Sequence, residues 1–145
     1  MAKRRVLLVG GDSGVVAVID QYFRECHGDY EVESIEYCDD ALILLRRSPF
    51  DLVLILSLNA PWRTWPSLSS PTVRIGSRSA ILFLKQMRGL HSAPPAILVS
   101  GSAFRQTEEE SRANGAFALV LKPVNLPELD RFVRLALEGR DGPTR

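Results

Sequence analysis

The chain has 145 residues, 46% of them hydrophobic and 24% charged, values close to the average for soluble globular domains. These values exclude a disordered chain, a collagen and a coiled coil. No apolar run is long enough to span a bilayer, and the apolar stretch near the start is too short for a signal peptide. The two cysteines, Cys26 and Cys38, exclude a disulfide framework and show no Cys/His metal-binding spacing. We therefore expect one cytoplasmic domain over residues 1–140, followed by a short tail over 141–145.

The net charge of +1 conceals a strong asymmetry along the chain. No acidic residue lies between Asp51 and Glu108, whereas six basic residues do, so this stretch carries +6 and the remainder −5. This uneven distribution of charge bears on the choice of binding partners rather than on the fold. Two interpretations remain open: a dedicated anionic partner, or basic loops with no such role.

The first half of the chain predicts two strand–helix units. A continuous apolar run closed by two glycines indicates a buried strand that enters a tight turn, and an apolar face repeating every three or four residues indicates the helix after it. A more polar strand, typical of a sheet edge, and a short helix follow. The predicted elements are a strand at Arg5–Val9, a helix over Val15–Cys26 with Asp12 or Ser13 as N-cap, a strand at Tyr30–Tyr37, and a helix over Ala41–Arg47 capped by Asp39 and Asp40.

The second half repeats the alternation three times. Its first strand, like the first strand of the chain, is apolar on both faces, which is typical of central strands in a parallel sheet covered by helices. The predicted elements are a strand at Asp51–Ser57, a helix over Ala80–Arg88 stopped by Gly89, a strand at Ala96–Ser100, a short polar helix around Glu108–Ala113 ended by Asn114 and Gly115, a strand at Phe117–Leu121, and a last helix capped by Asn125 and closed by Gly139.

Five strands that are each followed by a helix predict an α/β fold with parallel strands and right-handed crossovers. For five strands, the flavodoxin-like order 2-1-3-4-5, with helices on both faces, places the polar second strand at an edge. No internal repeat or second domain is evident.

Ligands of open α/β sheets bind outside the carboxyl ends of the strands. The candidate site residues at these ends are Gly10, Gly11, Asp12, Ser57, Ser100 and Lys122. Each also fits a purely structural role: the glycines in a tight turn, Asp12 as a helix cap, the serines as small strand ends, and Lys122 with Pro123 as a turn.

Four ordered motifs carry a family resemblance over nearly the whole chain: VLLVGGD, DLVLILSLNAP, ILVSG and ANGAFALVLKP. Together they resemble the receiver domain of two-component response regulators. The resemblance implies phosphorelay signalling, an aspartate that accepts a phosphoryl group from a phosphohistidine, an acid pair that holds Mg²⁺ with it, and a Ser or Thr and a Lys that contact the phosphoryl oxygens. It also implies a cis peptide bond between Lys122 and Pro123.

The sequence departs from this pattern at the reactive positions. By position, Gly10 and Gly11 replace the acid pair and Ser57 replaces the acceptor, while Asp12, Ser100 and Lys122 remain. Mg²⁺ requires carboxylate oxygens, and a serine hydroxyl is a poor nucleophile without an adjacent base or metal. Leu119 stands at the position of the family's aromatic switch residue. We therefore expect a pseudo-receiver with no cofactor and no Mg²⁺ site.

A long insertion at about residues 61–79 separates the third strand from the third helix. It contains both tryptophans of the chain and no acidic residue, and loops of this length are usually functional or disordered. Exposed Trp and Arg are typical of interaction hot spots, so the partner-binding candidates are Trp62, Arg63, Trp65, Arg74 and Arg78. Three interpretations remain open: a cap over the former phosphorylation pocket, a docking arm for an acidic partner, or a mobile loop.

The leading functional hypothesis is a non-enzymatic signalling module that acts by protein–protein interaction. Its expected partners are signalling proteins, with a histidine kinase, another regulator and a second copy of the chain as candidates. Two alternatives are an orthodox phosphorelay regulator with an atypical acceptor and a small anion- or nucleotide-binding domain using VGGDSG, a string that matches neither GxGxxG nor the P-loop. Membrane binding is not expected, and no recognisable reading helix supports nucleic-acid binding.

Overall fold

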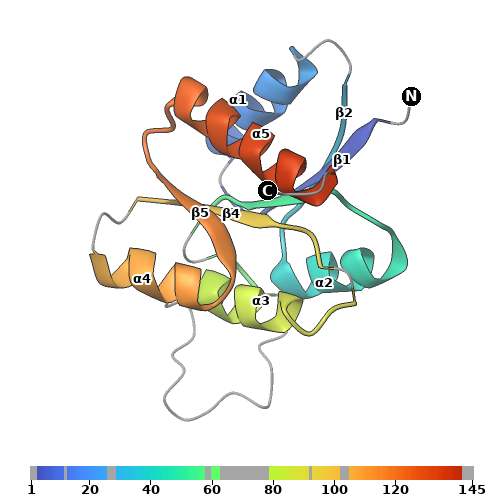
Figure 1. Ribbon diagram of the computed structural model, residues 1–145, viewed down its shortest axis with the longest axis vertical. Helices are drawn as coiled ribbons and strands as arrows, with labels where there is room; N and C mark the ends of the chain where they lie inside the picture. Colours follow the sequence, from blue (N-terminus) through green and yellow to red (C-terminus); the bar gives the residue numbers. More distant parts are fainter. Residues whose placement is uncertain are drawn as a thin grey trace.

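A computed structural model describes residues 3–11, 13–25, 29–57, 60–62, 79–91, 93–101 and 105–141, with backbone alone for 105–108 and 139–141. Figure 1 shows a central sheet with helices on both faces. The strands are β1 (Arg4–Val9), β2 (Tyr30–Ile35), β3 (Leu52–Ile55), β4 (Ala96–Ser100) and β5 (Ala116–Leu121). The helices are α1 (Ser13–Arg24), α2 (Cys38–Arg47), α3 (Ser79–Met87), α4 (Arg105–Ala113) and α5 (Leu126–Asp141).

All neighbouring strands are parallel, and their order is β2-β1-β3-β4-β5, as the sequence predicts. Helices α1 and α5 cover one face of the sheet, and α2, α3 and α4 cover the other (Figure 1). The apolar strands β1, β3 and β4 lie inside the sheet, where both of their faces are covered. Polar β2 lies at an edge, in agreement with its charge pattern.

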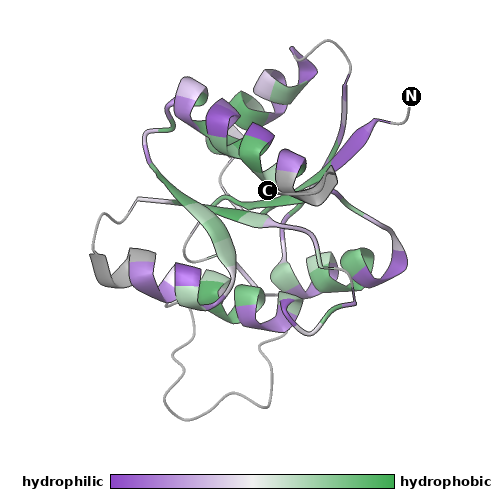
Figure 2. Ribbon diagram, in the orientation of Figure 1, coloured by the Kyte–Doolittle hydropathy of each residue, from purple (hydrophilic) through white to green (hydrophobic). Residues whose placement is uncertain are grey.

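Alternating strand side chains divide the core into two layers, one on each face of the sheet. Towards α1 and α5, the buried side chains include Leu8, Leu54 and Phe23. Towards α2 and α3, they include Leu7, Ile55 and Phe83. Figure 2 shows the resulting distribution, with hydrophobic residues concentrated in the central strands and polar residues on the outer faces of the helices. None of the helices in the described part of the chain combines the length and apolarity needed to cross a bilayer.

Several predicted boundaries require correction. Helix α2 begins at Cys38 instead of Ala41, because the Ala41 amide already donates to the carbonyl of Tyr37 (3.0 Å). Asp39 and Asp40 therefore lie in the first helical turn, where their charge favours the helix dipole, rather than before the helix as caps.

The last helix is also longer than predicted, because α5 continues through Gly139 to Asp141. A glycine inside a helix costs only about 1 kcal/mol relative to alanine, which neighbouring residues can offset. Strands β2 and β3 are shorter than predicted, and α4 begins at Arg105. The predicted N-cap is confirmed for Asn125, whose Oδ1 accepts from the Glu128 amide (2.9 Å).

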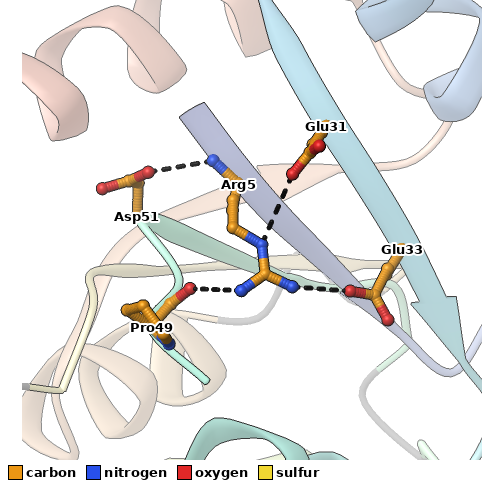
Figure 3. Close-up of polar contacts among 5 residues, drawn as sticks. All are labelled: Arg5, Glu31, Glu33, Pro49 and Asp51. Carbon is orange, nitrogen blue, oxygen red and sulfur yellow. Dashed lines mark hydrogen bonds and ion pairs between the residues drawn. The ribbon is translucent and has the colours of Figure 1, made fainter. Parts of the chain in front are cut away.

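Arg5 of β1 connects β2 with the segment that precedes β3, at the amino edge of the sheet (Figure 3). Its Nη2 lies 2.8 Å from Glu33 Oε1 and its Nε lies 3.6 Å from Glu31 Oε1, both on β2. Its Nη1 donates to the carbonyl of Pro49 (3.0 Å), and its backbone amide donates to Asp51 Oδ2 (2.9 Å). The guanidinium also lies 4.3 Å from the ring centre of Phe50. The side chain therefore joins edge strand β2 to the segment that enters β3.

Replacing Arg5 by alanine is expected to lower the free energy of unfolding by about 1 to 2 kcal/mol. Exposed ion pairs contribute at most about 1 kcal/mol, and the contact with the Phe50 ring adds a similar amount. Urea unfolding of Arg5→Ala measures the loss, and 1 M NaCl should weaken only the ion-pair part in the unmodified chain. Exposed Arg47→Ala is the control and should change stability by less than about 0.5 kcal/mol. An equal loss in both variants would remove any special role for Arg5.

Candidate functional site

The predicted site residues that the structure describes lie along one edge of the sheet. Gly10 and Gly11 follow β1, Ser57 follows β3, Ser100 ends β4, and Lys122 follows β5. Ser100 is fully buried, whereas Ser57 and Lys122 are half-buried. The Lys122 amide donates to the Ser100 carbonyl (2.9 Å), which fixes the ends of β4 and β5 together. Of the remaining candidates, Trp62 is described, whereas Asp12, Arg63, Trp65, Arg74 and Arg78 lie outside the described residues.

Gly10 and Gly11 both adopt the left-handed backbone conformation, with φ of +71° and +84°. A Cβ atom at Gly10 would lie 2.9 Å from Ala60 Cβ, and one at Gly11 would lie 2.7 Å from Leu56 Cβ. Real Cβ atoms essentially never approach a neighbour so closely, and L-residues rarely adopt this φ. The backbone and its neighbours therefore both specify glycine at the two positions where the receiver pattern has acids.

The short segment Ala60–Trp62 covers Gly10 and is fixed by several hydrogen bonds. The Ala60 carbonyl accepts from Ser79 Oγ (2.6 Å) and lies 3.7 Å from Cys38 Sγ, while the Pro61 carbonyl accepts from the Cys38 amide (2.8 Å). The Ala60 side chain is fully buried. These contacts attach the segment to the first residues of α2 and α3, so we call Ala60–Trp62 the cover segment.

Sequence reasoning missed the residues that close this edge, namely Leu56, Ala60, Cys38 and Ser79. Leu56 is fully buried in the core layer beneath α1 and α5. The signal present in the sequence was the pair Gly10–Gly11 itself, because two adjacent glycines mark a close approach of another part of the chain. The glycines alone do not indicate which part of the chain approaches them, because that depends on the fold.

Among the described residues, this edge offers no carboxylate at the positions where the receiver pattern places its Mg²⁺ ligands. Glycine supplies no side-chain ligand, and Ser57 supplies a hydroxyl where the receiver pattern has a carboxylate. Within the described ranges, no group of three or more His, Cys, Asp or Glu side chains is close enough to share a metal ion. The space next to the two glycines is occupied by Leu56 and Ala60.

Cys38, beneath the cover segment, has a strongly perturbed thiol. Burial, followed by the neighbouring charge of Asp39, raises the pKa of the Cys38 thiol to about 12. The thiol therefore remains protonated and unreactive at neutral pH, as in a buried structural cysteine.

An apolar hollow of about 410 Å³ lies beside Lys122, between the start of α1 and the turn that follows β5. It is lined by Gly14, Val15, Val18, Lys122, Pro123 and Val124. Val18 is 49% exposed, so an aliphatic side chain of α1 is accessible at this hollow. The expected cis peptide bond between Lys122 and Pro123 is confirmed. This hollow is an accessible part of the edge.

Trp62 lies where the insertion begins, and it contacts the residue at which α3 begins. Its ring packs against the core layer beneath α2 and α3, and its Nε1 donates to the Ser79 carbonyl (3.3 Å). The contact holds residues 62 and 79 together. The two ends of the range 63–78 are therefore held together by the residues that flank it.

Replacing residues 63–78 by a short Gly/Ser linker is expected to leave the fold intact, with a free energy of unfolding within about 1 kcal/mol of the original. Loop-closure entropy depends only weakly on length when the two ends are already fixed. Urea unfolding measures the effect. The matched variant Trp62→Ala in the full-length chain should destabilise more, because it removes the contact between the ends. Unfolding of the linker variant would show that residues 63–78 belong to the core.

Comparisons with known proteins identify the same fold. No family model matches the chain. One curated relative, the regulatory protein AtoC of Escherichia coli K12, is 34% identical over 73 residues, which is 50% of this chain and 16% of AtoC. The chain therefore spans about one sixth of the length of that relative.

The similar solved structures are response-regulator receiver domains. A CheY-like receiver domain of Methanospirillum hungatei JF-1 is 24% identical, with a TM-score of 0.74 and coverage of 97% of this chain and 98% of that one. A two-component response regulator from Clostridium difficile is 15% identical, with a TM-score of 0.75 and coverage of 97% and 100%. The receiver domain of the sensor histidine kinase PA1611 from Pseudomonas aeruginosa PAO1, which has a magnesium ion in its active-site cleft, is 18% identical, with a TM-score of 0.71 and coverage of 94% and 98%. At these identities, the likeness establishes the fold.

Proposed function

We propose that the chain is a receiver-like signal-transduction module that acts in the cytoplasm by protein–protein interaction, without aspartyl phosphorylation and without catalysis of its own. The observation that carries the proposal is the packing at Gly10 and Gly11. Both have positive φ, and a side chain at either would collide with Ala60 or Leu56. The space that an acid pair would require is thus part of the packed structure.

The loss of phosphoryl transfer follows from the chemistry of three positions together. A receiver needs a carboxylate oxygen as nucleophile and a divalent cation to neutralise the charge that develops during transfer. Ser57 offers a hydroxyl, and Gly10 and Gly11 offer no ligands. Ser100 and Lys122 alone supply one hydroxyl and one cation, a pair that would contact an anion without activating it.

Without phosphoryl transfer, the proposed function depends on exposed surfaces that can bind a partner. The hollow beside Lys122 exposes Val15 and Val18 of α1 next to Pro123 and Val124, and it provides an apolar contact area with one cation at its border. A second exposed set lies on β5 and α5, where Phe117, Leu121 and Leu135 are each more than 40% exposed. Arg131 and Arg134 on α5 and Glu109 on α4 are exposed, so a second copy of the chain would meet charges of both signs. A histidine kinase, another regulator and a second copy of the chain are the partners that we consider.

The insertion supplies a third set of contacts. Its arginines, Arg63, Arg74 and Arg78, lie within a stretch that has no acidic residue, which favours an acidic partner surface. Trp62 and Trp65 are the aromatic anchors that such a surface would use. Trp62 already donates its Nε1 to Ser79, so it would offer a partner only the exposed part of its ring. The linker variant described above should keep the fold and lose this binding.

Phosphorylation can be tested directly by intact-mass measurement. The chain is incubated with acetyl phosphate and Mg²⁺, and its mass is recorded with and without later acid quench. We expect no addition of a phosphoryl group, whereas an active receiver domain treated in parallel should gain one. A stoichiometric addition that is lost in Ser57→Ala would instead support an orthodox phosphorelay regulator with an atypical acceptor.

A further inference from the structure

A second hollow, of about 460 Å³, lies at the opposite edge of the sheet from Gly10 and Ser57. It is bounded by the end of α3, the starts of β4 and β5, and the last part of α5. Its floor is apolar and buried, with Leu84 and Met87 from α3 and Ala136 from α5 each at most 3% exposed. Among the described residues that line it, Arg88 carries the only charge.

A strand irregularity places an aromatic ring at the border of this hollow. Ala96 of β4 pairs with Ala116 of β5, but the next residue, Ile97, pairs with Ala118. Phe117 is therefore an extra residue in β5, a β-bulge, and its side chain is 43% exposed. Bulges re-aim side chains and are frequent next to functional sites. An exposed phenylalanine beside an apolar floor enlarges the surface available to a ligand.

Arg88 is held in place at the same hollow by the turn between α4 and β5. Gly115 in this turn has φ of +103°, and a Cβ there would lie 3.3 Å from both Cγ and Cδ of Arg88. Glycine thus lets the arginine stem lie across the turn, where Nη1 donates to the Ala113 carbonyl (3.2 Å). Within the described part of the chain, no carboxylate pairs with this guanidinium, so Nη2 and Nε have donors to offer a ligand.

We propose that this hollow binds a small amphipathic carboxylate, with its apolar body against Leu84, Met87 and Phe117 and its carboxylate on the guanidinium of Arg88. The volume lies within the range of small-molecule sites, which are mostly apolar with a few fixed polar groups. A guanidinium that already donates one hydrogen bond loses less conformational entropy on binding, and it matches a carboxylate with two parallel donors. The site lies at the amino edge of the sheet, so it does not depend on the function proposed for the carboxyl edge.

The test uses three probes that differ only in their head group: octanoate, octanol and octylammonium. Each is titrated into ¹⁵N-labelled protein below its micelle concentration, and the backbone amide signals of Arg88, Gly115 and Phe117 are followed by NMR. We expect saturable shifts with octanoate, and an affinity for octanol at least about tenfold weaker, because a charge-assisted hydrogen bond contributes at least 1.4 kcal/mol. Arg88→Met should remove this preference, whereas Arg46→Met, on the exposed face of α2, should leave it unchanged.

A second variant keeps the test decisive if Arg88→Met loses its fold. Ala93→Phe introduces a ring at an exposed residue of the hollow while keeping Arg88, and it should abolish octanoate binding. Equal affinities for all three probes, unchanged octanoate binding in Arg88→Met or Ala93→Phe, or no saturable shift at these amides would each overturn the proposal.

Discussion

Replacing Gly11 by aspartate is expected to lower the free energy of unfolding by at least about 4 kcal/mol, and Gly10→Asp should have a similar effect. A non-glycine residue at positive φ costs about 1 to 2 kcal/mol, overpacking adds about 1 to 3 kcal/mol, and a carboxylate beside Leu56 and Val16 adds a desolvation cost. Gly10→Ala and Gly11→Ala separate the desolvation cost from the backbone and packing costs, because alanine carries no charge. Each alanine variant should lower the free energy of unfolding by at least about 2 kcal/mol. Urea unfolding at neutral pH measures all four variants.

Gly101 is the matched control for these substitutions. It follows β4 at the same edge of the sheet, and a Cβ there would meet nothing within 4 Å. Gly101→Asp should therefore change stability by less than about 1 kcal/mol. The unfolding curves are repeated with 10 mM MgCl₂, which should not restore the glycine variants. Stabilisation of Gly10→Asp or Gly11→Asp by Mg²⁺ would mean that the acid pair and its metal can be accommodated after all.

Native Cys38 should react with iodoacetamide about a thousandfold more slowly than an unfolded thiol at pH 8. The reactive species is the thiolate, and a pKa of about 12 instead of 9.0 lowers its population by about three orders of magnitude. The rate should also keep rising about tenfold per pH unit up to pH 11, whereas the rate of an unfolded thiol levels off above pH 9. Labelling is measured by mass spectrometry in a Cys26→Ser background, so that Cys38 is the single thiol.

The same shift predicts how stability depends on alkaline pH. Below pH 9 the thiol is neutral in both states, and Cys38 adds no pH dependence. Between pH 9 and about 12 only the unfolded thiol ionises, so stability falls by up to about 1.4 kcal/mol per pH unit relative to Cys38→Ala. Parallel stability curves for the two proteins would contradict the burial of this thiol.

The cover segment lies against Cys38, and a variant can test whether it limits access to the thiol. Ser79→Ala removes the hydrogen bond to the Ala60 carbonyl and should speed the labelling of Cys38 severalfold. Exposed Ser34→Ala is the control and should leave the rate unchanged. If both variants label at the original rate, Ser79 does not hold the cover segment in place.

Local patterns were sufficient to predict the fold because each strand and helix has a clear periodicity. The apolar runs at β1 and β3 indicated central parallel strands, and the polar β2 suited the edge position in the flavodoxin-like order. Helix ends were less predictable, since they depend on tertiary contacts. The Cys38 amide donates to Pro61, more than twenty residues away, and α2 begins there rather than at its acidic residues.

The site was predictable only in its outline. Strand ends placed Gly10, Ser57, Ser100 and Lys122 at one edge because parallel strands share their carboxyl side. The neighbours of the glycines could not be predicted, because Leu56 and Ala60 look like ordinary apolar residues in the sequence. Their role depends on how close their Cβ atoms lie to the two glycines, where an added Cβ would come within 3 Å of them, and no local pattern encodes this proximity. The Phe117 bulge was missed for the same reason, since a strand pattern does not reveal its register with a neighbour.

We propose that the edge formed by Gly10, Gly11 and Ser57 cannot hold Mg²⁺ or an acyl-phosphate mimic. The most direct measurement is an NMR titration of ¹⁵N-labelled protein with Mg²⁺ and then with Mg²⁺ plus beryllofluoride, with the amides near Ser57, Ser100 and Lys122 as reporters. We expect no saturable shift at these amides, with a phosphorylatable receiver domain titrated in parallel as the positive control. Saturable shifts at Ser57 and Lys122 that require both Mg²⁺ and beryllofluoride would contradict the claim and restore phosphorylation to this site.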